Sequence, residues 1–267
     1  MRMLFGVLFL STLINIAPGQ ECSPNLSGSD ANVRVQRLTI ESSTLPNGDR
    51  ERIARSLEHC SWSLLELEER IRQALRDLGY FKANADEPRV SFVKQGTRDA
   101  DVSIKVQEGP QYRLGDIRFE KASLFPPDRL REQFAILPGD LFNATKFGQG
   151  LEQLRNLYAT EGHVNFVGVP VVAIDESRRT IDLTIDVDEG KPYNFGRLLL
   201  DGSEPRAGSG KALMESWSSL EGKRYNPLAL KQWLEANSSA WPGIASAKRD
   251  LIQSQQSLAV DVHLSLP

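Results

Sequence analysis

Histidine is the side chain most often used for metal binding and for proton transfer near neutral pH. The chain contains three, His59, His163 and His263, and no two of them have a metal-ligand spacing. His163 occupies the place that Tyr80 holds in a repeat described below, which favours a structural role. The sequence also lacks a Gly-x-Ser-x-Gly elbow, a phosphate-binding loop and a Cys-x-x-Cys pair. We therefore expect no enzyme activity, catalytic residue, metal site or cofactor.

A run of carboxylates is the second place where chemistry could occur. Asp182, Asp186, Asp188 and Glu189 look like a paired acidic site, as a general acid and base require. The three aspartates, however, fall at alternate positions of a segment whose other positions are Ile181, Leu183, Ile185 and Val187. Because side chains alternate across a strand, this pattern predicts a solvated strand face rather than a catalytic pair.

The two cysteines, Cys22 and Cys60, are the remaining reactive groups. In an oxidising compartment they could pair and tie the N-terminal segment to the first repeat. They could equally stay as two unpaired thiols, because sequence does not supply the geometry that a disulfide needs.

The N-terminus predicts export. Arg2 precedes an apolar run from Met3 to Leu10, and Ala17-Pro18-Gly19 provides the small residues of a cleavage site. The apolar run is short for a membrane span, so we assign residues 1–19 to a signal peptide rather than to an uncleaved anchor. Lipidation of Cys22 is rejected because Glu21 stands where a small residue is required. The formal net charge is −3, and the sequence contains no block of basic residues, so we expect no nucleic-acid partner.

Internal repeats organise the rest of the chain. Val102-Ser-Ile-Lys-Val-Gln-Glu-Gly and Leu183-Thr-Ile-Asp-Val-Asp-Glu-Gly lie 81 residues apart, and each is followed by a tyrosine and a glycine at the same spacing. A second signature occurs three times, as a leucine followed five residues later by an aromatic residue and then by a helix-capping residue. Its cap positions are Ser63, Asn143 and Asn226.

Each repeat is predicted to run strand, helix, helix, strand, strand. In the first copy the strand is 33–40, the helices carry Ile53 and Leu57 and then 64–78, and a hairpin follows with 90–92 and 102–106. The second copy repeats this order up to the hairpin 167–174 and 181–187. The third copy keeps 195–200, 213–220, 228–237 and a last strand at 258–266. The predicted modules are 32–110, 111–191 and 192–267, with an α+β fold in which each has a three-stranded sheet and two helices on one face.

These features resemble POTRA domains, the periplasmic modules of the outer-membrane β-barrel assembly superfamily that includes surface antigens and assembly factors. The resemblance rests on Gly79-Tyr80-Phe81, on Gly162-His163-Val164, and on the Glu-Gly-Pro and Glu-Gly-Lys ends of the strands quoted above. It covers about residues 32 to 267. The third copy departs from it, with Asn237-Ser-Ser-Ala-Trp-Pro-Gly243 in place of the glycine–aromatic turn. A β-barrel, which family members typically carry, does not follow Pro267 in this sequence, so we expect either a barrel-less relative or a truncated sequence.

The resemblance implies a binding function at sheet edges. The family's sheet order places the second strand outermost, where it can accept an extended chain by β-augmentation. The implied partners are an outer-membrane β-barrel protein or its unfolded precursor and other envelope assembly proteins, met in the periplasm, with membrane contact only through a partner barrel. The candidate strands are 89–94 and 167–174. Their partner-binding residues are Val90, Phe92, Val93, Val167, Val169, Pro170 and Val171.

Two alternatives stay open. These strands could be ordinary sheet structure, with Pro170 protecting an edge against aggregation. The protein could also be a structural adaptor that holds an envelope complex together without binding unfolded clients.

Overall fold

The computed structural model describes residues 32–202 and 204–266. The predicted signal peptide and Cys22 therefore lie outside the described residues. No helix in the described part of the chain is both long and apolar enough to cross a membrane. The described chain divides into two compact units, and the boundary between them passes through the second predicted module. One unit contains residues up to 118 with 134–150 and 171–184, and the other contains 119–133, 151–170 and the residues from 185 onward.

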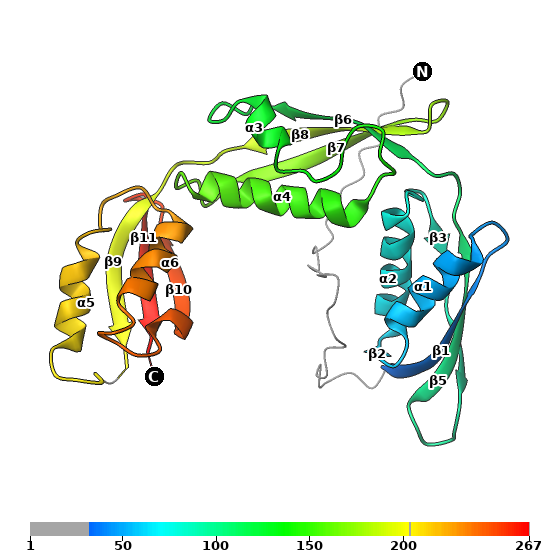
Figure 1. Ribbon diagram of the computed structural model, residues 1–267, viewed down its shortest axis with the longest axis horizontal. Coiled ribbons are helices and arrows are strands. Elements are labelled where there is room, and N and C mark those ends of the chain that lie inside the picture. The colour runs from blue at the N-terminus through cyan, green and yellow to red at the C-terminus, as the bar shows by residue number, and fades with distance from the viewer. Residues whose placement is uncertain (1–31, 203, 267) are drawn as a thin grey trace. The chain divides into compact units, whose positions relative to one another are not determined.

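The first module begins with a nine-residue strand and contains two helices. Its sheet order is β2-β1-β5-β3, and β4 also pairs with β5. Figure 1 shows these elements in colours that run from blue through cyan to blue-green. Their bounds are β1 Val33–Glu41, α1 Asn47–Leu57, β2 Ser61–Trp62, α2 Leu64–Asp77, β3 Asn84–Ala85, β4 Arg89–Phe92 and β5 Asp99–Gln107. The sheet has five strands instead of the predicted three, because two-residue pairings at β2 and β3 extend it.

The second and third modules each have a three-stranded sheet. The orders are β6-β8-β7 and β10-β11-β9, so the last strand of each module is central. The second module comprises β6 Arg113–Glu120, α3 Pro127–Arg131, α4 Ala144–Ala159, β7 Val167–Asp175 and β8 Thr180–Asp188. The third comprises β9 Asn194–Asp201, α5 Ser209–Trp217, α6 Pro227–Ala236, a 3₁₀ turn at Ile244–Ser246, β10 Lys248–Ser254 and β11 Ala259–Ser265. The predicted α+β architecture of β-α-α-β-β units is confirmed; the exact module boundaries stay a prediction.

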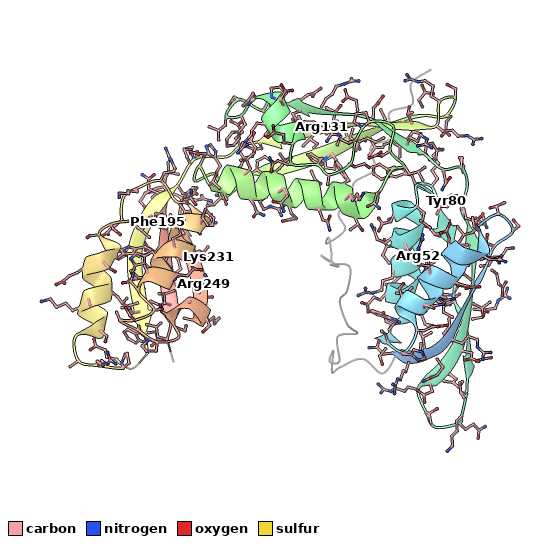
Figure 2. All side chains as sticks on the ribbon, in the orientation of Figure 1. Arg52, Tyr80, Arg131, Phe195, Lys231 and Arg249 are labelled. Atoms are coloured by element: carbon pink, nitrogen blue, oxygen red, sulfur yellow. The ribbon has the colours of Figure 1, made fainter. Side chains whose placement is uncertain are left out.

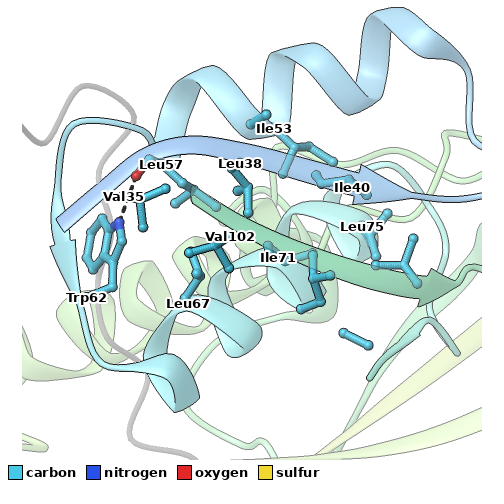
Figure 3. Packing of buried hydrophobic residues seen from close by; sticks show 14 of the residues in the cluster. Val35, Leu38, Ile40, Ile53, Leu57, Trp62, Leu67, Ile71, Leu75 and Val102 are labelled. Atoms are coloured by element: carbon cyan, nitrogen blue, oxygen red, sulfur yellow. Dashed lines mark hydrogen bonds between the residues drawn. The ribbon is translucent and has the colours of Figure 1, made fainter. Parts of the chain in front are cut away.

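One face of each sheet carries the core. In β5 every second residue from Ala100 to Val106 is buried, and the residues between them are not. Both helices of the first module contribute to the same apolar cluster as this face, which places them on one side of the sheet. Figure 3 shows the cluster, with the indole Nε1 of Trp62 donating to the Leu57 carbonyl at 2.9 Å. Burial of these side chains is the main stabilising contribution to so small a module.

Helix starts follow the capping residues that the sequence predicted. The Ser63 hydroxyl accepts a hydrogen bond from the Glu66 N–H at 3.2 Å, and Asn226 Oδ1 accepts from Leu228 and Ala229. Asn143 Oδ1 likewise accepts from the Lys146 N–H at 2.7 Å. Asn47 and Gly48 form the first turn of α1, which follows Pro46.

The third module replaces the missing glycine–aromatic turn with tryptophan packing. Trp217 is almost fully buried, donates to the Gly196 carbonyl at 2.9 Å and meets Trp233 edge to face. Trp241, from the divergent segment, is also buried in this cluster. The departure from the repeat pattern therefore keeps a core but shortens the second helix, since α6 has 10 residues and α2 and α4 have 14 and 16.

Candidate strand-addition edges

In all three sheets the first strand of the hairpin, which is the second strand of the predicted repeat, is outermost. β4 pairs only with β5, β7 only with β8, and β10 only with β11 within the described chain. The sheet position that the resemblance implied for 89–94 and 167–174 is therefore what the structure has. Such strands carry backbone donors and acceptors on the side that faces no neighbour.

The direction of these backbone groups in β4 follows from one hydrogen bond. The Val93 N–H donates to the Asp99 carbonyl at 2.9 Å, so Val93 directs its backbone groups at β5. Residues alternate in an antiparallel pair, and the register runs on through Ser91 and Asp101. Val90 and Phe92 therefore direct their N–H and C=O groups outward. Phe92 and Val93 are each 61% exposed, and Val90 is half-buried.

β7 presents a row of valines on the exposed face of its sheet. Val167, Val169 and Val171 are exposed, while the residues between them, Gly168 and Pro170, are half-buried. The strand is nine residues long, more than twice the length of β4. Pro170 lies at its middle, where it removes one backbone donor.

β10 is an edge that the sequence did not predict. Six of its seven residues are exposed, and only Ser254 is half-buried. Leu251 and Ile252 point to opposite faces of the sheet because they are consecutive strand residues. The adjacent apolar pair breaks the alternation that identifies a strand, and the only available signal was its position before the turn that leads into 258–266.

A glutamate fixes the loop that follows the first strand in two of the modules. Glu108 accepts hydrogen bonds from the hydroxyls of Ser42 and Thr44. Glu189 accepts from the Ser123 N–H at 2.7 Å, the Ser123 hydroxyl at 2.6 Å and the Leu124 N–H at 2.8 Å. Burial would raise the pKa of Glu189, but these bonds outweigh it and lower the pKa to about 2. The glutamate of the repeated Glu-Gly pair therefore anchors this loop in both modules.

The turn after the long helix is held in the same way twice. In the first compact unit the Tyr112 N–H donates to the Gly79 carbonyl at 2.8 Å and Asn143 Nδ2 donates to the Asp77 carbonyl at 3.0 Å. In the second unit the Tyr193 N–H and Asn226 Nδ2 make the matching bonds at the same distances, with the carbonyls of Gly162 and Thr160. Both glycines have positive φ, of 87° and 81°, and backbone or side-chain atoms would crowd a Cβ there.

Charged groups reinforce the contact at Asp77. Its carboxylate accepts from the Thr145 N–H at 2.8 Å and the Thr145 hydroxyl at 2.7 Å, at the N-terminus of α4. Burial raises the pKa of Asp77, and the hydrogen bonds from Thr145 and Gln73 oppose that rise. In the same unit Glu176, in the turn after β7, accepts from the Tyr112 hydroxyl at 2.6 Å and pairs with Lys82.

The histidine and two of the aspartates that could have supported catalysis make hydrogen bonds or ion pairs within their own module. His163 is buried, with Nδ1 2.9 Å from the Glu189 carbonyl oxygen. Asp186 pairs with Lys121 at 2.8 Å, and Asp188 accepts from the Gly190 N–H. The aspartates alternate with buried residues of β8, as the strand pattern predicted. No group of His, Cys, Asp and Glu in the described chain has the arrangement of a metal site.

Cys60 is buried in the first module's core and is disulfide-bonded. The other cysteine of the sequence, Cys22, lies outside the described residues. Pairing of the two stays a prediction.

Known proteins share both the repeat and the fold. The family model described as POTRA, surface antigen variable number repeat, matches residues 63–109 and 112–190. The outer membrane protein assembly factor BamA of Buchnera aphidicola is 27% identical over 149 residues, which are 55% of this chain and 24% of that protein. BamA of Neisseria meningitidis serogroup B is 25% identical over 136 residues, or 47% of this chain and 17% of that protein.

The chain thus spans about a quarter or less of the curated relatives it matches. Among solved structures, the crystal structure of Haemophilus influenzae BamA POTRA3-5 matches with a TM-score of 0.64. The match has 18% sequence identity and covers 88% of this chain and 96% of that one, so it establishes a shared fold.

Proposed function

The chain carries tandem POTRA domains, and from this premise we propose that it is a periplasmic scaffold for the assembly or export of outer-membrane proteins. It acts by accepting an extended segment of a client or partner at the edge strands of its sheets. The observation that carries the proposal is the recurrence of an outermost second strand in every module. The relatives named as outer membrane protein assembly factors support the cellular role.

Backbone geometry supports strand addition over binding at a pocket. Val90 and Phe92 direct donors and acceptors outward, and the neighbouring Phe92 and Val93 side chains are exposed and apolar. An added strand would gain backbone hydrogen bonds and cover this apolar surface at once. An unfolded β-barrel precursor fits such an edge, since its strands alternate apolar and polar residues.

Photocrosslinking tests this proposal. A benzophenone amino acid replaces Phe92 in one variant and Val171 in another, and the full mature chain is irradiated with an unfolded barrel precursor. A matched control places the probe at Leu65, which is 73% exposed but lies on α2 and not on β4 or β7. We expect capture of the unfolded precursor at Phe92 and Val171 and little at Leu65. Capture of folded partners alone would contradict client binding and favour the structural adaptor.

A further inference from the structure

The direction of the backbone groups in β10 follows from the hydrogen bonds that its neighbour β11 makes with β9. Even-numbered residues along β11 face β9, as the two residues that flank the strand indicate: the Leu258 carbonyl accepts from the Asn194 N–H at 2.9 Å, and the Leu266 N–H donates to the Asp201 carbonyl at 2.7 Å. Odd-numbered residues of β11 must then face β10, where Asp261 is paired with Ile252 and His263 with Asp250. Arg249, Leu251 and Gln253 therefore direct their N–H and C=O groups to the outer edge.

The three edges differ in how many outward groups they offer. β10 presents three outward residues at alternate positions, each with an N–H, whereas β4 presents Val90 and Phe92. In both strands the outward residues are those paired with buried core residues of the central strand, such as Val102 and Val262. In β7, Pro170 is half-buried and its neighbours on each side are exposed, so Pro170 lies on the core-facing side of the strand. By the same relation, its backbone groups point outward. Its missing N–H interrupts the middle of that edge.

Side chains leave β10 open on both sheet faces. Leu251 lies on the helix-bearing face beside Val262, and Ile252 lies on the other face beside Asp261. Each is 48% exposed. The second helix of this module, α6, is four residues shorter than the corresponding helix α2 of the first module. An incoming strand can therefore cover apolar surface above and below the sheet plane.

Charges along β10 define the partner further. Arg249 forms no salt bridge with any residue that the structure describes, and it lies on the helix-bearing face, where Figure 2 labels it together with Lys231 of α6. Burial raises the pKa of the Tyr225 hydroxyl, and the positive charge of Arg249 opposes that rise. On the other face Asp250 is paired with Lys248 at 3.4 Å.

We propose that β10 is the principal strand acceptor and that its occupant is an extended segment of the pattern polar, apolar, apolar, basic, acidic. The assignment rests on the proposed function, which it narrows to one edge and one class of peptide. An antiparallel strand with its central apolar residue opposite Leu251 places a second apolar residue opposite Ile252 and a polar residue opposite Gln253. The basic residue then faces Asp250 and the acidic residue faces Arg249. Directly opposed pairs of this kind stabilise a sheet, and like charges destabilise it.

A peptide with selective backbone methylation tests the assignment. The probe is a fluorescein-labelled nonapeptide with Thr-Val-Leu-Lys-Glu at its centre, titrated into the full mature chain and followed by anisotropy. Methylating the amide of the residue opposite Leu251 removes a donor aimed at β10, and methylating the next amide removes one aimed at solvent. We expect about tenfold weaker binding in the first case and less than about threefold in the second. Equal losses for the two peptides would overturn the assignment.

Protein variants identify the edge. L251P removes an outward N–H of β10, as Pro170 does in β7, and F92P does the same in β4. We expect L251P to abolish peptide binding and F92P to preserve it, and the opposite result would assign the peptide to β4. Because L251P could disturb the fold, R249E provides a second test. It should weaken the Lys-Glu peptide about tenfold, and a peptide in which only that glutamate is replaced by lysine should restore binding, because the first lysine still faces Asp250; no rescue would contradict the predicted register.

Two outcomes separate this inference from the proposed function. If Phe92 and Val171 probes capture unfolded precursor while L251P has no effect on capture or peptide binding, the function stands and β10 is not the acceptor. If the chain dimerises in sedimentation and L251P abolishes the dimer without competition by the peptide, the occupant of β10 is a second copy and the peptide assignment is overturned.

Discussion

β7 and β10 hold the same place in their sheets but offer an added strand different surfaces. β7 is longer and has three exposed valines on one face, yet its helix-facing side is half-buried and Pro170 interrupts its outward donors. β10 is shorter, and it is exposed on both faces with an unbroken outward series at Arg249, Leu251 and Gln253. Exposed apolar side chains and available backbone groups are therefore separate properties of an edge strand. Exposed apolar side chains can mark an edge strand whose backbone groups are nevertheless protected against pairing.

The core beneath β10 provides the largest expected contrast. Trp217→Ala removes a buried indole, its hydrogen bond to Gly196 and its contact with Trp233, so we expect a loss of about 3–5 kcal/mol in the free energy of unfolding. Met214→Ala on the same helix is the control, because Met214 is exposed and should cost under about 0.5 kcal/mol. Urea unfolding gives both values. Capture by a probe at Val171 in β7 should survive Trp217→Ala; its loss would show that the two edges are not independent.

Proline at neighbouring positions of β10 separates inward from outward backbone groups. Ile252→Pro removes an N–H that faces β11 and leaves the Asp261 carbonyl without its donor, at a cost of about 2 kcal/mol. Leu251→Pro removes an outward N–H and should cost under about 1 kcal/mol, as an edge proline does. Thermal unfolding followed by circular dichroism compares them. Equal destabilisation would mean that the register assigned to β10 is wrong.

Glu189 distinguishes the second module by its response to acid. Its pKa of about 2 lies below the usual value near 4.3 in an unfolded chain, so the unfolded state binds more protons between these pH values. The stabilisation is complete above about pH 4.3 and is lost as the pH falls toward 2. Glu189→Gln should cost about 1 kcal/mol at pH 7 and flatten the pH dependence in that window. An unchanged pH profile in denaturant melts would contradict the anchoring role of Glu189.

Pro170→Val is the smallest change in stability and bears directly on the β7 edge. It adds an outward N–H and a β-branched side chain, so the free energy of unfolding should change by less than about 1 kcal/mol. Crosslinking of precursor through Val171 should rise severalfold, and the chain should self-associate more readily. If neither crosslinking nor association changes, Pro170 does not control that edge.

Much of the fold followed from short-range signals. The capping residues Ser63 and Asn226 fixed the starts of α2 and α6, because a side-chain acceptor at the first turn satisfies free backbone donors. Alternation of apolar residues located β5 and β8 for the same local reason. β2 and β3 were missed, since two-residue strands have no periodicity and depend on pairing with distant residues.

The candidate site was less accessible from sequence. The predicted partner-binding residues lie in β4 and β7, except Val93, which directly follows β4. Their exposure does not reveal which backbone groups face outward. That direction depends on register, which a hydrogen bond such as Val93 to Asp99 establishes only in three dimensions. β10 escaped prediction because Leu251 and Ile252 are consecutive and both partly exposed, a pattern without a buried face.

Residue-resolved amide hydrogen exchange on the full mature chain, with and without an unfolded barrel precursor, tests strand addition most directly. Strand addition predicts that binding slows exchange at the outward amides of Arg249, Leu251 and Gln253, while amides that already face β11, such as Ile252, change little. A smaller slowing at Val90 and Phe92 is expected in β4. Protection confined to the helices, or the absence of any alternation along the edge strands, would contradict it.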